Sequence, residues 1–92
     1  MIIHLDITIK GNVQGVFYRA STKAVADQLG VKGIVRNHPN GDVFIEAEAD
    51  KLSMGMFLEW CSEGPENAYV TSVESHEGEL KNYRNFDIVK RG

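Results

Sequence analysis

A glycine-containing segment that ends in an arginine is the part of this sequence best suited to bind an anion. The segment runs from Gly11 to Arg19 as GNVQGVFYR. Gly15 allows the backbone to curl so that successive N–H groups converge, and Arg19 supplies a planar, permanently charged guanidinium that matches phosphate oxygens. These residue types at this spacing predict an anion-binding turn, with backbone N–H groups as donors and Arg19 as the counter-charge.

The segment lacks two common nucleotide-binding signatures. A P-loop has four residues between its glycines and then Gly-Lys followed by Ser or Thr, and a dinucleotide-binding loop has a third glycine; the segment contains neither. Two glycines and one arginine are by themselves also compatible with a tight connection between two elements, in which Arg19 is a solvated side chain. The surrounding sequence has to decide between these interpretations.

A predicted strand precedes the segment and a predicted helix follows it. Residues 3–10 alternate strictly between apolar and polar types, which predicts a strand with one buried face. After the segment, apolar residues recur with the helical period as far as Gly30, a natural stop. The apolar face of this helix is predicted to contain Ala20, Ala24, Val25 and Leu29. Because N–H groups at a helix start are free and the helix dipole favours an anion there, this placement suits phosphate binding.

Two further strands are predicted over residues 31–37 and 43–49. The Asn40-Gly41 pair between them is typical of a tight hairpin turn, so the two strands are expected to pair antiparallel. Alternation in the second strand separates a small apolar side from a largely acidic one. The acidic side is predicted to be solvated, and it carries Phe44, Glu46 and Glu48.

The last third of the chain predicts one helix and two weaker strands. Asp50 suits the cap of a helix that ends at Gly64-Pro65. The apolar stripe of that helix is predicted to contain Leu52, Met56, Phe57, Trp60 and Cys61. The two strands are predicted over residues 69–76 and 83–89, with a turn over 77–79.

This order of elements predicts a ferredoxin-like α+β fold. Its pattern is βαββαβ with a possible extra terminal strand, which gives a two-layer α/β sandwich of an antiparallel four- to five-stranded sheet with both helices on one face. Residues 1–92 are expected to form a single domain. Because this architecture hosts RNA binders, metal chaperones, small-ligand sensors and enzymes, the fold alone does not name a function.

Composition and charge narrow the class of partner. The net charge is −3, the wrong sign for a protein whose main affinity comes from nucleic-acid phosphates or anionic lipid, so no nucleic acid and no membrane partner is expected. The lone cysteine, Cys61, cannot form an internal disulfide, and no leader or membrane-length apolar run is visible, which predicts a cytoplasmic protein. A chain of this size needs no metal or disulfide to stabilise its core.

Three stretches of the sequence together resemble the acylphosphatase family, small enzymes that hydrolyse the carboxyl–phosphate bond of acyl phosphates. The first is the GNVQGVFYR segment itself. The second is GIVRN at residues 33–37, followed by Gly41 and Val43, and the third is YRNFDI at residues 83–88. The resemblance covers essentially the whole chain in length, in motif order and in the pattern of elements.

The resemblance implies roles for specific residues. Arg19 matches the family's phosphate-binding arginine, and Asn37 matches the asparagine that positions the attacking water. The backbone cradle for the phosphate would be formed by the amides of Gly15, Val16, Phe17, Tyr18 and Arg19. The expected reaction is direct attack of water on phosphorus, with no metal, no cofactor and no covalent enzyme intermediate. A small acyl phosphate would be the substrate, inorganic phosphate the product and a competitive ligand, and the enzyme a monomer.

The chain departs from the family pattern at three positions. Asn12 stands where an arginine is usual, Ile34 where an aromatic is common, and Tyr69 where a basic residue is frequent. None of these positions is one of the two expected catalytic residues. The departures bear on the electrostatics near the segment, and hence on phosphate affinity and substrate preference.

Other reactive side chains are assigned no catalytic role. His4, His38 and His76 stand far apart in the sequence without ligand-like companions, and His38 is the one closest to the expected site. Cys61 falls on an apolar helical stripe, where a small core residue is expected rather than a nucleophile. Adjacent strand residues point to opposite faces, so Arg36 is expected to point away from the site.

Three alternative functions remain open at this stage. An RNA-binding module of the same fold would need a basic and aromatic third strand, whereas residues 42–48 are acidic. A phosphate or acyl-phosphate sensor would keep the cradle but show no turnover. A carbamoyl-phosphate-handling domain of a larger hydrogenase-maturation enzyme is the third, although the chain, from Met1 to just after the last predicted strand, is expected to be self-contained.

Overall fold

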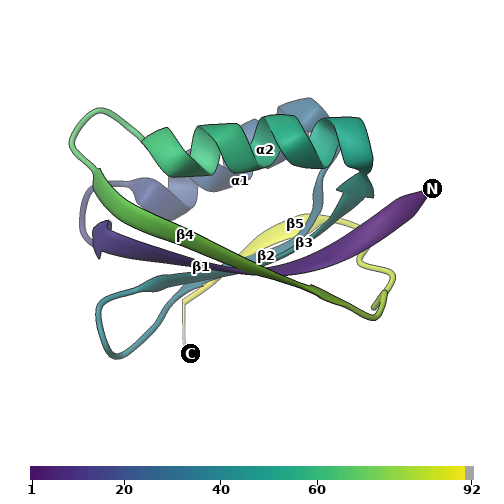
Figure 1. Cartoon of the computed structure of the whole chain (residues 1–92). Helices are drawn as coiled ribbons and strands as arrows, with labels where there is room; N and C mark the ends of the chain where they lie inside the picture. Colours follow the sequence, from purple (N-terminus) through teal and green to yellow (C-terminus); the bar gives the residue numbers. More distant parts are fainter. Residues whose placement is uncertain (91–92) are drawn as a thin grey trace.

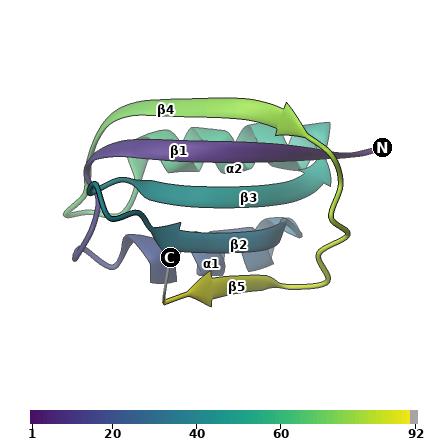
Figure 2. The ribbon, with the colours of Figure 1, turned by 90° about the horizontal axis from the view of Figure 1, so that it is seen from below.

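The computed structural model of this chain describes residues 1–90 and shows two helices stacked on one five-stranded sheet (Figure 1). The elements in chain order are β1 (Ile2–Asn12), α1 (Tyr18–Leu29), β2 (Lys32–Asn37), β3 (Val43–Asp50), α2 (Lys51–Glu63), β4 (Tyr69–Gly78) and β5 (Phe86–Val89). The strand order across the sheet is β4-β1-β3-β2-β5 (Figure 2). Both helices cover the same face, which confirms the predicted ferredoxin-like sandwich. Neither helix is long and apolar enough to cross a membrane.

The core lies between the helices and the covered face of the central strands. β1 pairs antiparallel with both β3 and β4, and Ile7 stands opposite Ile45 in this register. Side chains of a strand alternate between the two faces, so every second residue of β1 and β3 meets the helices. The fully buried members of this set are Ile7, Ile9, Val43, Ile45 and Ala47. The strict alternation of residues 3–10 therefore gave the correct buried face.

The buried face of α1 is rotated from the predicted one. Tyr18, Thr22 and Ala26 are buried, whereas Ala20 and Ala24 are exposed. The phase of the helix is set by Tyr18, whose ring enters the core at the first position and makes a hydrogen bond inside it. Large aromatic side chains contribute more burial energy than alanines, so the helix turns the tyrosine inward.

The limits of α2 are as predicted, and its apolar stripe is correct for Phe57, Trp60 and Cys61 but not for Leu52 and Met56. Asp50 caps the helix by accepting a hydrogen bond of 2.8 Å from the Ser53 N–H, and Gly64 ends it. The buried residues are Met54, Phe57 and Cys61, at a helical spacing that places them on one face. Leu52 and Met56 belong to the opposite side and are 76% and 51% exposed, so their assignment to the core was wrong.

The final strand is shorter than predicted, because residues 83–85 do not join the sheet. β5 contains only residues 86–89 and runs parallel to β2, with Phe86 buried. The connection from β4 passes the ends of the central strands before it reaches β5 (Figure 2). Within it, the N–H groups of Lys81 and Tyr83 donate to the Glu48 carboxylate, at 2.6 and 3.1 Å, instead of to a neighbouring strand. Asn82 between them has a left-handed backbone, φ 60°, which an extended strand does not contain.

The pairing of β1 with β4 is irregular just before the loop that leads to α1. The pairing of β1 with β4 shifts between Lys10 and Gly11, where φ is 131°. A Cβ atom at Gly11 would lie 2.1 Å from the carbonyl oxygen of Tyr69, so only glycine fits this close approach. The extra residue of this bulge is Thr71 of β4, because Lys10 pairs with Ser72 and Gly11 with Val70. Gly11 thus lets β1 stay paired with β4 up to Asn12, where the loop to α1 begins.

Candidate active site

A pocket of about 430 Å³ lies between the loop before α1, the end of β2 and the end of β5. Its lining consists of Val13, Gly15, Phe17, Tyr18, Arg19, Ala20, Asn37, Ile88 and Lys90. The structure thus brings together Arg19 and Asn37, which are eighteen positions apart in the sequence and belong to different elements. Ends of strands and starts of helices meet here, where free backbone groups are concentrated.

The loop has the backbone conformation of an anion-binding nest. Gly15 has φ 73° and Phe17 has φ 61°, both in the left-handed region, and α1 begins directly after Phe17. Alternation of left-handed and helical residues turns successive N–H groups toward one point. No hydrogen bond within residues 1–90 uses the N–H groups of Gly15, Val16 and Phe17. A phenylalanine that is 81% exposed and held at positive φ is strained, and such strain is concentrated at functional sites.

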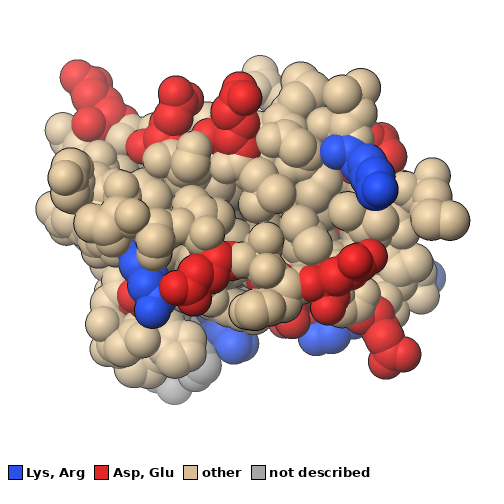
Figure 3. Space-filling view, viewed as in Figure 1, with Lys and Arg blue, Asp and Glu red and all other residues tan. Residues whose placement is uncertain are grey.

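Arg19 is the free cation of this pocket on the α1 side. It lies in the first turn of the helix, and within residues 1–90 it forms no ion pair with a carboxylate. The lining contains no Asp or Glu among the described residues. The protein as a whole is acidic, and the face in Figure 3 shows acidic side chains with a few basic ones between them. The pocket is therefore locally positive on a protein of negative net charge, which suits a small anion.

Asn37 contributes an unusual hydrogen-bond acceptor. It is the last residue of β2, and its side-chain Oδ1 is buried and has no hydrogen-bond partner among the described residues. Buried polar atoms are almost always hydrogen-bonded in native structures, and the exceptions cluster at functional sites. Asn37 also lines the pocket, so its side-chain amide lies beside any molecule bound there, and an amide oxygen is a hydrogen-bond acceptor.

Gln14 fastens the loop to the hairpin that follows Asn37. The two hydrogens of its Nε2 are donated to the carbonyl oxygens of His38, at 2.8 Å, and Asp42, at 2.9 Å. These bonds join the segment that carries the free N–H groups to the turn next to Asn37. The role of Gln14 is not visible in the sequence, since a glutamine in a loop carries no signal of its long-range partner.

Replacing Gln14 with glutamate should loosen this attachment, because a carboxylate of the same size offers no hydrogen to either carbonyl. We expect kcat/KM for an acyl phosphate to fall roughly tenfold, since a small misplacement of the reacting groups is costly. Asn40→Ala is the matched control, because Asn40 hydrogen-bonds Asp42 in the same turn without contacting the loop. Steady-state kinetics of both variants make the comparison; an equal loss in both would show that only the turn's stability matters.

The structure places the other predicted site residues as follows. Gly15, Phe17 and Tyr18 line the pocket, whereas the side chain of Val16 packs against the core and only its backbone belongs to the loop. His38 does not line the pocket and contributes its carbonyl to the Gln14 contact. Arg36 lies over the Phe44 ring at 4.9 Å, outside the pocket, in accord with the expectation that it points away.

Lys90 is a pocket residue that the sequence analysis missed. It follows β5, in which Phe86 is buried in the core and Ile88 lines the pocket. Residues 86, 88 and 90 share one side of an extended chain, so the alternation that placed Phe86 inward also directs Lys90 to the pocket. The signal was present, but the predicted strand ended one residue earlier.

Cys61 is a core residue, as expected. It is fully buried in α2, and burial raises the pKa of its thiol to about 12. Its backbone carbonyl accepts a hydrogen bond of 2.8 Å from the Tyr18 hydroxyl, whose pKa burial also raises above its ordinary value. The thiol stays protonated at neutral pH and offers no nucleophile.

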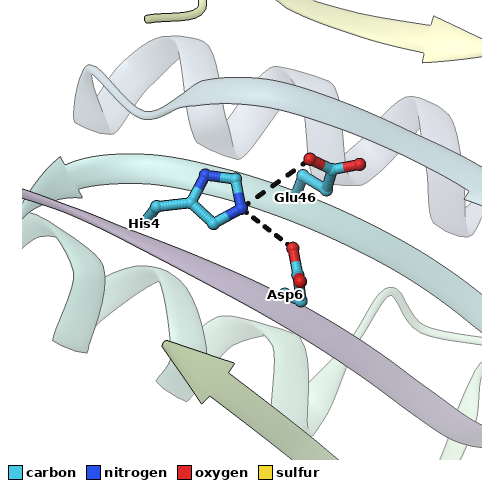
Figure 4. A group of neighbouring side chains, drawn as sticks. All are labelled: His4, Asp6 and Glu46. Atoms are coloured by element: carbon cyan, nitrogen blue, oxygen red, sulfur yellow. Dashed lines mark hydrogen bonds and ion pairs between the residues drawn. The ribbon is translucent and has the colours of Figure 1, made fainter. Parts of the chain in front are cut away.

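A second cluster of reactive side chains lies on the open face of the sheet, away from the pocket. His4, Asp6 and Glu46 each offer one atom that could coordinate a metal ion, and these three atoms lie within 4.8 Å of one another (Figure 4). The His4 Nε2 lies 2.8 Å from Asp6 Oδ1 and 3.7 Å from Glu46 Oε1, and its Nδ1 lies 2.7 Å from Glu48. The expectation that the histidines lack companions was therefore wrong for His4.

The possible metal-ligating atoms of this cluster already form hydrogen bonds or ion pairs with one another or with neighbouring groups. Glu46 accepts from the Lys81 ammonium, at 2.7 Å, and from the Tyr83 hydroxyl, at 3.0 Å. Burial alone would lower the pKa of His4, but its hydrogen bonds to Glu48 and Asp6 outweigh burial and raise it. Both ring nitrogens of His4 face carboxylate oxygens at hydrogen-bond distance, so neither has a free lone pair directed at an open metal position. We therefore interpret the cluster as an ion-pair network that fastens the connection after β4 to the sheet.

This network also corrects the prediction of a solvated acidic side on β3. Glu46 and Glu48 are 7% and 4% exposed, because the segment after β4 covers them. Burial would raise the pKa of Glu48, but the N–H of Lys81, the His4 ring and the N–H of Tyr83 outweigh it and hold the pKa below its usual range. The apolar–polar alternation of β3 identified this face of the strand correctly. It could not show that a segment distant in the sequence covers that face.

Comparisons with known proteins agree with this geometry. The family model for acylphosphatase matches residues 5–88. An acylphosphatase from Archaeoglobus fulgidus is 42% identical over 88 residues, which is 96% of this chain and 99% of that protein. The solved acylphosphatase from Coxiella burnetii has a TM-score of 0.92 at 34% identity, with 96% of this chain and 93% of that chain covered.

A third similarity concerns a much larger protein. The structure of full-length HypF in its phosphate- and nucleotide-bound form matches all of this chain with a TM-score of 0.86 and 28% identity, but the match covers only 13% of the HypF chain. The fold described here is thus also found as a small part of a longer protein.

Proposed function

Since this chain belongs to the acylphosphatase family and hydrolyses the carboxyl–phosphate bond of acyl phosphates, we propose that Arg19 and Asn37 are its catalytic residues. The backbone amides of Gly15, Val16, Phe17, Tyr18 and Arg19 form the cradle for the phosphoryl group. Residues 1–92 act as a single domain, and inorganic phosphate is both product and competitive ligand.

One observation carries this assignment. Asn37 and Arg19 line the same pocket; within residues 1–90, the buried Oδ1 of Asn37 has no hydrogen-bond partner and the Arg19 guanidinium pairs with no carboxylate. An acceptor and a cation have complementary uses in hydrolysis, because the cation binds the phosphoryl oxygens and the acceptor takes a hydrogen bond from the attacking water. A simple phosphate sensor would need the cation and the cradle but would have no use for a buried acceptor.

The chemistry requires little beyond these two functions. Water attacks phosphorus, the bond between phosphorus and the acyl oxygen breaks, and the acyl group leaves as a carboxylate with the electron pair of that bond. A carboxylate is a stable leaving group and needs no general acid. Phosphoryl transfer then depends on holding water in line and on neutralising charge on the equatorial oxygens. The proton released by water ends on the inorganic phosphate, so no residue of the protein has to retain it.

Cleavage in isotopically labelled water tests the direction of attack. The protein hydrolyses benzoyl phosphate in ¹⁸O-water with excess chelator, and mass spectrometry locates the label in the products. We expect the label in inorganic phosphate and undiminished turnover in chelator. Label in benzoate would show attack on the carbonyl carbon and would overturn the roles given to Arg19 and Asn37.

A further inference from the structure

The pocket has room for more than the phosphoryl group. Its volume of about 430 Å³ is within the range of roughly 300–1,000 Å³ typical of pockets that hold whole small molecules. The free N–H groups and Arg19 belong to one side of the pocket, at the loop before α1. The acyl part of the substrate must occupy the remaining space, so the residues that line it determine which acyl groups bind well.

Lys90 brings a second cation to the pocket from a different element. β2 and β5 run parallel with Arg36 opposite Val89, and the next positions along this register are Asn37 and Lys90. Within residues 1–90, Lys90 forms no ion pair, and no described Asp or Glu lines the pocket. Among residues 1–90, therefore, no carboxylate neutralises Lys90 on the β5 side of the pocket or Arg19 on the α1 side.

The two cations differ in what they recognise. A guanidinium fork at a helix start, together with free N–H groups, matches the fixed geometry of phosphoryl oxygens. A lysine ammonium is a hydrated point charge on a flexible stem, and it suits a negative group whose distance varies from ligand to ligand. A substrate with a second negative group is also repelled by the net charge of −3, so a local cation is needed to accept that group.

We propose that Lys90 is a specificity-determining residue, which favours acyl phosphates whose acyl part carries a negative group of its own, such as a carboxylate. This inference rests on the proposed function of the same pocket. It assigns the phosphoryl group to Arg19 and the cradle, and the distal negative group of the substrate to Lys90.

A matched pair of substrates tests the inference. Benzoyl phosphate and 4-carboxybenzoyl phosphate have the same reacting bond and differ by one rigidly placed carboxylate. We expect Lys90→Gln to lower kcat/KM for the carboxylated substrate about fivefold, through KM, as for a partly exposed ion pair. The same variant should lower kcat/KM for benzoyl phosphate by a clearly smaller factor, and Lys90→Arg should retain most of the preference for the carboxylated substrate because it keeps the charge.

Lys32→Gln is the control for net charge, since Lys32 is exposed at the opposite end of β2 and does not line the pocket. An equal loss for both substrates in Lys90→Gln would assign Lys90 to the phosphoryl or leaving group and overturn the inference. If Lys32→Gln lowers kcat/KM for the carboxylated substrate as much as Lys90→Gln does, the preference comes from long-range electrostatic attraction. That result would also overturn the inference. Failure of the unaltered protein to hydrolyse either substrate would instead contradict the proposed function.

Discussion

Replacing Arg19 with alanine should lower kcat/KM for benzoyl phosphate at least about 100-fold, as for the loss of a principal contact to the transition state. Arg19 is the guanidinium that lines the pocket, and within residues 1–90 no carboxylate pairs with it. The charge on the transferring phosphoryl oxygens would then be met by N–H groups alone. Binding of inorganic phosphate should weaken as well, and titration calorimetry or competitive inhibition can measure it.

Two further variants separate the role of Arg19 from a general loss of charge. Arg19→Lys keeps the charge but loses the planar fork, so we expect activity between those of Arg19→Ala and the unaltered protein. Arg84→Ala removes an exposed arginine that does not line the pocket, and its kcat/KM should stay within twofold. The assignment fails if Arg19→Ala and Arg84→Ala are impaired alike, or if Arg19→Ala loses turnover only because its free energy of unfolding has collapsed.

The elements of this fold were predictable because local signals agree with tertiary packing. Strict alternation in β1, the Asn40-Gly41 turn and the Asp50 cap each have a short-range physical cause, and each is confirmed. Errors arose where a long-range contact decided the outcome. Tyr18 set the phase of α1 by entering the core, and Glu48 drew the backbone of residues 81–83 away from the sheet. Such contacts join residues that no local pattern relates.

In the candidate site, too, features with a local cause could be predicted and features that depend on long-range contacts could not. The anion-binding character of the loop follows from Gly15 and Arg19, because glycine conformation and a fixed charge are properties of the residues themselves. The distance between that loop and Asn37 depends on the strand order, and the attachment through Gln14 depends on carbonyl groups that any residue type could supply. Lys90 reaches the pocket only because β5 pairs in parallel with β2, a pairing that short strands do not specify in sequence.

The departures from the family pattern also become clearer in three dimensions. Asn12 and Tyr69 stand opposite each other in the pairing of β1 with β4, and neither lines the pocket. Ile34 faces Glu46 and Asp87 in its pairings and is likewise absent from the lining. The positions at which the resemblance implies basic residues therefore lie beside the loop and outside the lining, so these departures do not change the residues that line the pocket.

Asn37→Ala should remove turnover and leave the affinity for inorganic phosphate nearly unchanged. Oδ1 of Asn37 has no hydrogen-bond partner among the described residues, so replacing Asn37 with alanine breaks no hydrogen bond made by this atom within residues 1–90. We expect kcat to fall about 100-fold or more, while the inhibition constant of phosphate changes less than threefold. The free energy of unfolding should stay the same or rise by about 1 kcal/mol, because an unsatisfied buried acceptor is removed.

Asn37→Asp completes this test, since a carboxylate still accepts a hydrogen bond but adds a negative charge beside the phosphoryl group. Like charges repel, so phosphate affinity should fall in this variant although it does not fall in Asn37→Ala. Asn40→Ala, in the adjacent turn and outside the pocket, should keep both turnover and phosphate affinity. A loss of stability and of phosphate binding together in Asn37→Ala would identify Asn37 as a residue that shapes the cradle. A loss of turnover alone, at unchanged or higher stability, would mean that an otherwise unfavourable buried acceptor is retained to hold the attacking water.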